Sequence, residues 1–296
     1  MTPMNVIDHS TDFGTREPAA IGAGSIRCFR PKLLTGIIDA IWDLDIPDSE
    51  TAKAFTIKWA PGTSLLLMAQ YRAPALVRQG GRILPYKCAT QIQSSSLTLQ
   101  PTGALGFVIV CLRPDAANRV VSAPLGQFAN ANIHLGNIFS RGDVSACDEL
   151  LAGARNSSER IATVEAFLIR RARPERDSLA SHAASCLRRN PTLPMQQVAS
   201  MLSVSTRQLS RSFNATFGMP PKQFARIARI EKIVAERRKG LSWAEIACAC
   251  DLADQSHLAR EFRGIIGEGP TEFFAHEIRE GTGKMTEANF VVQRTV

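Results

Sequence analysis

The sequence predicts an α+β protein, in which a β-rich N-terminal domain precedes an all-α C-terminal domain with two helix-turn-helix modules joined by a long helix. Three observations support this prediction. Short apolar runs separated by turn residues fill residues 37–112, and from residue 143 onward apolar residues recur at helical spacing. An internal repeat then divides the helical part into two similar units.

Length and composition are those of a globular protein with more than one domain. The chain has 296 residues, of which 45% are hydrophobic and 21% are charged, which excludes wholesale disorder and fibrous repeats. The net charge of +8 is compatible with an anionic partner. The sequence has neither a signal-peptide pattern nor an apolar run long enough for a membrane span. Its seven cysteines are scattered, so we expect reduced thiols and a cytoplasmic protein.

The β-rich part has six predicted strands, punctuated by Pro61-Gly62, Gly80-Gly81 and Thr102-Gly103. Such spacing is typical of an antiparallel sheet or small barrel. The predicted strands are residues 37–44, 54–59, 64–71, 75–77, 91–99 and 105–112. Two helices after residue 143 close this domain.

We expect five segments along the chain. The polar run that surrounds Pro174 is typical of a linker. The segments are a flexible N-terminal segment (1–24), the β-rich domain with its closing helices (25–172), the linker (173–178), the double helix-turn-helix domain (179–281) and a flexible tail (282–296).

The repeat matches in type and order over many positions. Residues 197–199 (Gln-Val-Ala) recur 48 positions later as residues 245–247 (Glu-Ile-Ala). At an offset of 49, Leu209-x-Arg211-x-Phe213, Phe217-Gly218, Pro221 and Phe224 return as Leu258-x-Arg260-x-Phe262, Ile266-Gly267, Pro270 and Phe273. A duplicated structural unit accounts for this agreement.

The first unit is predicted to be a helix over 195–202, a turn at Ser203-Val204 and a second helix that begins at Ser205 with a capping box to Gln208. The second unit has a helix over 244–250, the turn Asp251-Leu252 and a helix capped by Asp254. The second helices bury their apolar faces and expose polar and cationic side chains toward their N-terminal ends. These exposed residues are Thr206, Arg207, Ser210 and Arg211 in the first unit and Gln255, Ser256 and Arg260 in the second.

Turn residues and a linking helix complete the pattern. Gly218 and Gly267 stand where a helix end favours a positive φ, and Pro221 and Pro270 begin the next helices. A long helix over 224–238 then connects the units.

These residues, together with Arg229 and the run Asp254-Gln255-Ser256-His257-Leu258, resemble the DNA-binding domain of AraC/XylS-type transcriptional regulators. The resemblance covers about residues 177–280. It implies seven helices, two recognition helices in successive major grooves of double-stranded DNA, and an N-terminal effector-binding or dimerisation domain. The chain departs from the family at Asp251-Leu252, where Gly-Phe is common. Because Asp adopts a left-handed turn less readily than Gly, we expect the second module to be looser.

The predicted DNA contacts follow from side-chain chemistry. Arg207 and Arg211 can bind guanine bidentately and Gln255 can bind adenine. Lys222 and Thr271 can approach phosphate, and solvated surface is the alternative for both. Phosphate clamping or an internal salt bridge is the alternative for Arg211 and Arg260. Nine Lys and Arg and two acids lie in residues 207–239, whereas three Arg and eight acids lie in 240–281. We therefore expect the first module to anchor the protein, unless the acids face away from DNA.

The β-rich domain also resembles the N-terminal domain of a subgroup of these regulators, at Phe29-Arg30-Pro31, Leu34, Ile41-Trp42 and Leu112-Arg113-Pro114-x-Ala116-Ala117. Buried aromatic and large apolar side chains there are either core or the wall of an effector pocket. The candidates are Trp42, Trp59, Met68, Tyr71 and Phe107.

No metal-ligand spacing, nucleophile motif or cofactor motif stands out, so we expect no catalysis, cofactor or metal. Cys248 and Cys250 are expected to be small core residues. An enzyme with an appended DNA-binding module is the alternative function. The expected partners are promoter DNA and RNA polymerase, with a small-molecule effector and a homodimer as further candidates and no membrane.

Overall fold

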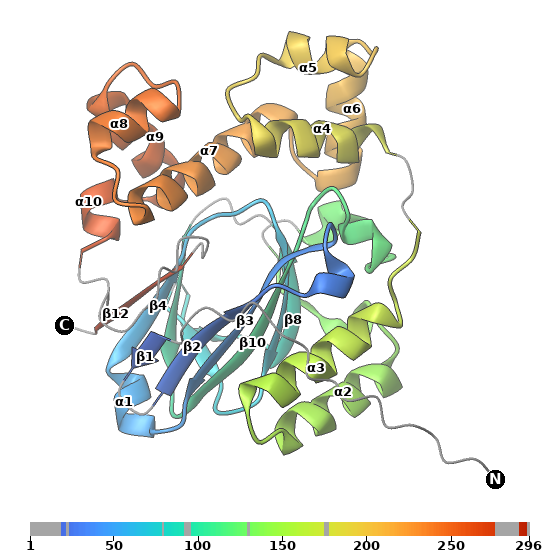
Figure 1. The fold of residues 1–296 in the computed structure, drawn as a ribbon, viewed down its shortest axis with the longest axis vertical. Coiled ribbons are helices and arrows are strands. Elements are labelled where there is room, and N and C mark those ends of the chain that lie inside the picture. Colours follow the sequence, from blue (N-terminus) through green and yellow to red (C-terminus); the bar gives the residue numbers. More distant parts are fainter. Residues whose placement is uncertain are drawn as a thin grey trace.

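The computed structural model describes residues 19–21, 24–78, 80–91, 96–128, 131–174, 178–275 and 290–294. A β-rich N-terminal part lies beneath an arch of C-terminal helices (Figure 1), which confirms the predicted fold class. None of the described helices is both long and apolar enough to cross a membrane.

The N-terminal part contains two antiparallel sheets. In spatial order, the first consists of β1 (Ala19–Ile21), β2 (Gly24–Phe29), β3 (Ile38–Ile46), β10 (Leu105–Leu112), β5 (Leu65–Gln70), β8 (Lys87–Gln91) and β11 (Ile133–His134). The second consists of β12 (Phe290–Arg294), β4 (Phe55–Trp59), β9 (Leu97–Pro101), β6 (Ala75–Val77) and β7 (Arg82–Ile83). The short helix α1 (Ser49–Lys53) connects β3 to β4.

Both faces of the seven-stranded sheet are buried. Successive side chains of a strand point to opposite faces, so Ile41 and Trp42 of β3 belong to different cores. Trp42 packs with Phe107 in the core between the sheets, whereas Ile41 packs with Val110 in the core beneath the helices. This two-sided burial accounts for the nearly continuous apolar sequence of β10.

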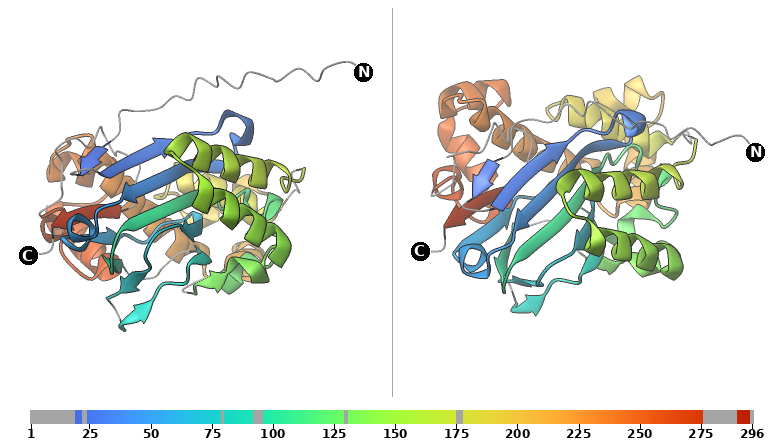
Figure 2. Two further views of the ribbon diagram at one scale, coloured as in Figure 1. Left: turned by 90° about the horizontal axis from the view of Figure 1, so that it is seen from below. Right: turned by 60° about the horizontal axis from the view of Figure 1, so that its bottom comes forward.

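Helices α2 (Arg141–Gly153) and α3 (Ser157–Ile169) lie across the outer face of this sheet (Figure 2). A buried polar cluster attaches α3 to it. Arg160 is 4% exposed and donates to both carboxylate oxygens of Asp43 at 2.9–3.2 Å, while Asp43 is fully buried. Tyr71 donates to Asp43 at 2.8 Å, and its ring lies 4.4 Å from the Arg160 guanidinium carbon. Burial, followed by the charge of Asp43, raises the pKa of Tyr71, so the phenol stays a neutral donor.

Seven helices follow in the described residues from 178 onward, the number that the family resemblance implies. They are α4 (Leu179–Arg189), α5 (Met195–Met201), α6 (Thr206–Phe217), α7 (Pro221–Arg238), α8 (Trp243–Ala249), α9 (Gln255–Ile266) and α10 (Pro270–Phe273). Helix α7 forms the arch, with α5 and α6 at one end and α8 to α10 at the other (Figure 1).

The first helical module shares its core with the β-rich part. Phe213 and Phe217 stack with centroids 4.6 Å apart, and this pair joins the same apolar cluster as Leu125 and Phe128 of the 3-10 helix η3 (Leu125–Phe128). A Cβ atom on Gly126 would lie 3.0 Å from the backbone nitrogen of Gly218. The two glycines therefore allow a close backbone approach that larger residues would prevent.

Several predicted elements need correction. Residues 91–99 are not one strand, because β8 ends at Gln91 and β9 begins at Leu97. Strand β2 was not predicted, and β1 lies within the segment expected to be flexible. Residues 290–294 form β12, although 282–296 were expected to be a flexible tail. Pairing with distant strands creates these elements, and local sequence patterns do not reveal it.

The buried ion pair provides a stability test. Asp43→Ala leaves the buried Arg160 guanidinium with Asp45 as its remaining carboxylate partner. We therefore expect the free energy of unfolding to fall by about 3 kcal/mol. The free energy of the first urea transition of the full chain measures this. Glu50→Gln, which removes the exposed Lys53–Glu50 pair, is the control and should leave the transition unchanged. Equal effects of the two variants would contradict a structural role for the buried pair.

Candidate nucleic-acid interface and interdomain cavity

The N-terminal half of α6 presents the side chains that the sequence analysis selected for DNA contact. Ser205 caps the helix by accepting a hydrogen bond from the backbone N–H of Gln208 at 3.1 Å, which is the serine half of the predicted capping box. Leu209, Phe213 and Phe217 are fully buried on the inner face. The exposed face carries Thr206, Arg207, Ser210 and Arg211.

Helix α9 repeats this arrangement in the second module. Asp254 caps it by accepting from the backbone N–H of His257 at 2.6 Å, as predicted. Leu258 and Phe262 are buried, whereas Gln255, Ser256 and Arg260 are exposed. Lys222 is exposed in the first turn of α7, and Thr271 is exposed in α10. All the predicted DNA-contact residues therefore lie on accessible surface near helix starts or recognition faces.

An ionic bridge fixes α9 relative to α7. Glu261 of α9 accepts from Arg226 at 3.1 Å and lies 3.8 Å from Arg229. Arg229 also donates to the carbonyl of Pro191, before α5. Arg229, which belongs to the family resemblance, thus contacts both modules from the linking helix.

Four of the eight acids in residues 240–281 cap helices or pair with cations. Glu245 completes a capping box with Ser242, a box that was not predicted, and Asp254 caps α9. Glu261 binds Arg226 and Glu268 binds Lys58. Two of these carboxylates, Glu261 and Glu268, are paired with cations, whereas Glu245 and Asp254 are exposed helix caps.

In both modules, the turn between the two helices of the helix-turn-helix contains a residue with a positive φ at the equivalent position of the repeat. Ser203 and Asp251 both have a φ of +54°. Gly218 and Gly267 end α6 and α9 in the left-handed region, as predicted, and Pro221 and Pro270 begin the following helices.

Cys250 is a buried core residue, but Cys248 is exposed, so the core prediction is wrong for Cys248.

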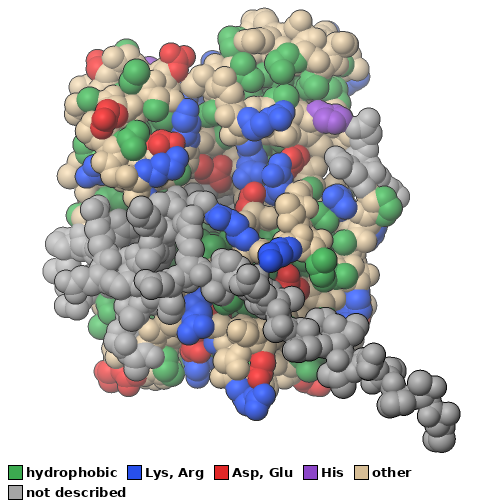
Figure 3. Space-filling view, viewed as in Figure 1, with side chains coloured by type: hydrophobic (Ala, Val, Ile, Leu, Met, Phe, Trp, Pro, Cys, Tyr) green, Lys and Arg blue, Asp and Glu red, His purple; other side chains and the backbone are tan. Residues whose placement is uncertain are grey.

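A cavity of about 610 Å³ lies between the β-rich part and helices α4 and α7. One wall is apolar and comes from Trp42, Trp59, Leu66 and Phe290. Five cations line the cavity, namely Arg30, Arg113, Arg188, Arg189 and Lys232, against the acids Asp39 and Glu231. Figure 3 shows Lys and Arg side chains gathered where the helices meet the β-rich part. Cations from both parts of the chain thus line the cavity together with the aromatic side chains, and two of them, Arg113 and Arg188, are paired with Asp115 and Asp39.

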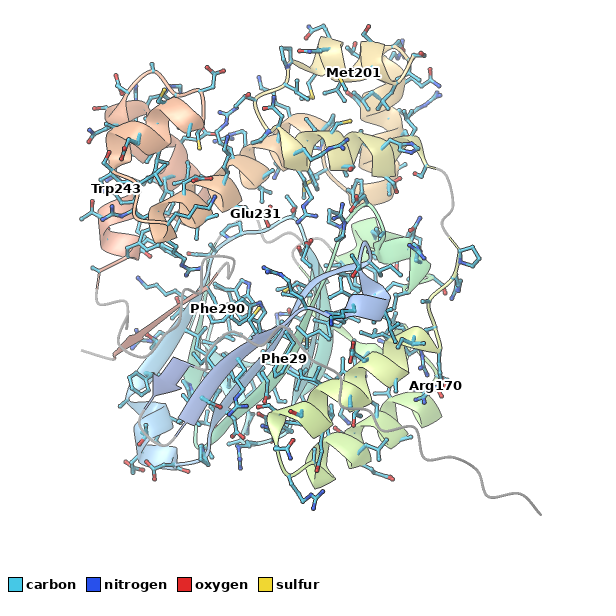
Figure 4. The ribbon with its side chains drawn as sticks, in the orientation of Figure 1. Phe29, Arg170, Met201, Glu231, Trp243 and Phe290 are labelled. Atoms are coloured by element: carbon cyan, nitrogen blue, oxygen red, sulfur yellow. The ribbon has the colours of Figure 1, made fainter. Side chains whose placement is uncertain are left out.

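The polar groups of the cavity connect the two parts of the chain. Arg188 of α4 donates to Asp39 at 2.7 Å, and Ser64 donates to the same carboxylate oxygen. Glu231 of α7 accepts from the backbone N–H and the hydroxyl of Thr63 at 2.8 and 2.7 Å. Figure 4 shows Glu231 on the side of α7 that faces the β-rich part. Burial raises the pKa of the Cys111 thiol in the cavity wall, so this thiol stays protonated.

The structure brings only two of the five predicted effector residues to this cavity. Trp42 and Trp59 line it. Met68 and Phe107 are buried in the core between the sheets, and Tyr71 is hydrogen-bonded beneath α3. The sequence analysis missed the cations and Phe290. Arg30 and Arg113 each stand in an Arg-Pro pair directly after a strand, which is the local signal that could have indicated them.

Comparison with protein families matches residues 198–276 to the model described as "Helix-turn-helix domain". These residues are an AraC-type helix-turn-helix domain. Through it the protein is a DNA-binding transcription regulator, as the sequence resemblance predicted. No curated protein sequence matches the chain.

Several solved structures are similar to parts of the chain. ToxT from Vibrio cholerae, in an apo form, matches 79% of this chain and 95% of its own at 12% identity and a TM-score of 0.44. The C-terminal domain of AraT, a response regulator from Geobacillus stearothermophilus, covers 32% of this chain and 83% of its own at 24% identity and a TM-score of 0.30. The DNA-binding domain of AdpA, in complex with a target DNA, covers 34% of this chain and 92% of its own at 25% identity and a TM-score of 0.30.

The left-handed turn at Asp251 provides a test of the second module. A non-glycine residue in the left-handed region is destabilised by roughly 1–2 kcal/mol. Replacing it with glycine removes this strain, but part of the gain is lost because glycine gives up more conformational entropy on folding. We therefore expect Asp251→Gly to stabilise the protein by about 0.5 kcal/mol, measured from its urea unfolding. Asp251→Ala, which keeps the strain, is the control and should not stabilise. A loss of stability in Asp251→Gly would contradict the conformation.

Proposed function

We propose that the protein regulates transcription by placing α6 and α9 in successive major grooves of promoter DNA, under the control of its β-rich N-terminal domain. The observation that carries this proposal is the pairing of two similar modules, each with an exposed polar or cationic helix start, across a single helix, α7. Because Glu261 of α9 binds Arg226 of α7, the second recognition helix has a defined orientation relative to the first. Two such helices can bind half-sites about one helical turn apart.

The roles of individual residues follow from their chemistry and exposure. Arg207 and Arg211 bind guanine through O6 and N7, and Gln255 binds adenine through N6 and N7. Thr206, Ser210, Ser256 and Arg260 supply further contacts to bases or phosphates, and Lys222 and Thr271 approach phosphate. The excess of Lys and Arg in residues 207–239 makes the first module and α7 the main anchor on the DNA backbone.

The domains divide these tasks. We assign sensing or dimerisation to residues 25–172, connection to 173–178 and DNA binding to 179–281. The protein acts by binding and not by catalysis, in the cytoplasm where its DNA lies, with RNA polymerase as a partner and a homodimer as its candidate assembly.

Selection of binding sites from a random DNA pool tests the DNA-binding role. We expect a site with two conserved patches about one turn apart. Arg207→Ala combined with Arg211→Ala should lose about 2–6 kcal/mol of specific affinity, at about 1–3 kcal/mol for each guanine contact. Arg155→Ala, which removes an exposed charge from the β-rich domain, is the matched control. If both proteins bind the selected site equally, α6 does not read the DNA.

The interdomain cavity supports an effector of defined chemistry. An aromatic wall opposite an excess of cations suits an amphipathic organic anion, such as a carboxylate with an apolar body. Such a ligand would contact Trp42 and Trp59 on one side and Lys232 of α7 on the other. Because such a ligand contacts both domains, its binding can favour one arrangement of the two domains over another and thereby change the affinity for DNA.

Thermal unfolding with 2-naphthoate and decanoate tests this ligand class. We expect each carboxylate to raise the melting temperature in a concentration-dependent way, and 2-naphthalenemethanol to raise it much less. Lys232→Met should weaken carboxylate binding about tenfold, equivalent to about 1.4 kcal/mol. Lys239→Met, on the same helix but outside the cavity lining, is the control. Equal shifts with the alcohol would contradict recognition of the anion.

A further inference from the structure

The strand that follows the DNA-binding helices belongs to the N-terminal domain. Strand β12 pairs antiparallel with β4, from Phe290 opposite Trp59 to Arg294 opposite Phe55. It is the edge strand of the five-stranded sheet and lies beneath the second module (Figure 1). The chain therefore crosses from the β-rich part to the helices and returns. We call residues 290–294 the C-terminal clasp.

The clasp completes the aromatic wall of the interdomain cavity. The side chain of Phe290 is fully buried, with its ring centroid 4.6 Å from that of Trp59 and 5.3 Å from that of Trp42 in an edge-to-face arrangement. Figure 4 shows Phe290 within the β-rich part, below α7. All three rings line the cavity. A ligand held against Trp42 and Trp59 therefore rests on rings that Phe290 holds in place.

The clasp and its partner strand also hold the second module. Arg238, at the end of α7, donates a hydrogen bond to the carbonyl of Phe290. Lys58 of β4 donates to both carboxylate oxygens of Glu268, which follows α9, at 2.8 and 2.9 Å. Directly after β4, Ala60 is buried in the apolar core of the second module. The strand that the clasp pairs with thus contacts the second module through Glu268 and, directly after the strand, through Ala60.

The first module is connected to the cavity through α4, whose Arg188 binds Asp39, and it has a further attachment to the β-rich part. It packs through Phe217 on Leu125 and Phe128, and through the contact of Gly218 with Gly126. Neither contact involves β4 or β12. A displacement at the cavity wall can therefore reach the second module without passing through the first.

We infer that the C-terminal clasp couples the cavity to the second helix-turn-helix module, with Phe290 as the residue that positions the two tryptophan rings of the cavity wall. This inference rests on the proposed effector site. A ligand that packs on Trp42 and Trp59 stabilises their packing on Phe290. It thereby stabilises the pairing of β12 with β4 and, through Lys58 and Ala60, the docked position of α9. The effector thereby acts on the orientation of one recognition helix relative to the other.

Hydrogen exchange on the full-length protein tests the coupling without a ligand. We expect Phe290→Ala to accelerate amide exchange at least tenfold in β4 and also in α8 to α10, while α5 and α6 keep their protection. Phe290→Leu, which keeps most of the apolar volume, should have a smaller effect of the same pattern. Phe139→Ala is the matched control, because it truncates a buried phenylalanine that packs on Phe167 of α3. Its effect should be confined to the neighbourhood of α2 and α3.

Binding of 2-naphthoate, measured by calorimetry, tests the role of Phe290 in ligand binding. Phe290→Ala should bind it at least tenfold more weakly than the wild type, and its affinity for the selected DNA site should no longer respond to 2-naphthoate. Unchanged exchange in α8 to α10 overturns the coupling, and unchanged or tighter naphthoate binding overturns the role of Phe290. If the wild type binds no naphthoate but the exchange pattern is as expected, the proposed ligand class fails and the coupling stands.

Discussion

The apolar core that the first helix-turn-helix module shares with the β-rich domain is the constraint on which the arrangement of the chain depends. Phe213, Phe217 and Phe224 pack in one cluster with residues of the seven-stranded sheet and of η3. This contact requires glycine at both 126 and 218, because a Cβ atom at either position would lie 3.0 Å from the opposing backbone. The orientation of α6 relative to the β-rich domain is therefore set by this shared core.

The second module is docked by a different kind of interaction. Its contacts with the β-rich part include the half-buried Lys58–Glu268 pair and the hydrogen bond from Ser96 to the carbonyl of Ile266 at 2.7 Å. Groups of this kind can exchange their partners for water at modest cost, whereas separating an apolar core exposes all of its surface. One recognition helix is thus firmly placed, and the other is held by contacts that a bound molecule can bias. In the proposed mechanism, this asymmetry lets a ligand in the cavity change the orientation of α9 relative to α6.

Sequence reasoning succeeded where the signal is local. The caps at Ser205 and Asp254, the left-handed glycines 218 and 267, and the exposed faces of α6 and α9 all follow from residues within one or two turns. It failed where distant segments meet. Phe290 could not be assigned to a cavity with Trp42, because 248 residues separate them and only strand pairing brings them together. The cations of the cavity come from two strand ends and two helices, so no window of the sequence contains them. Tyr71 was chosen for its aromatic ring, but its neighbour across the sheet, Asp43, and Arg160 of α3 determine its role.

The structure also shows that part of the charge difference between the two modules is cancelled by ion pairs. The acids of residues 240–281 suggested repulsion from DNA, but Glu245, Asp254, Glu261 and Glu268 are bound by caps or cations. Glu261 in turn neutralises Arg226, which counts among the cations of the first module and α7. The difference in effective charge between the two DNA-facing surfaces is therefore smaller than the sequence indicates. Arg207 and Arg211 are exposed at the start of α6. In the proposed binding mode they concentrate the electrostatic attraction to phosphate there, while Gln255, Ser256 and Arg260 of α9 would select bases once the first helix is bound.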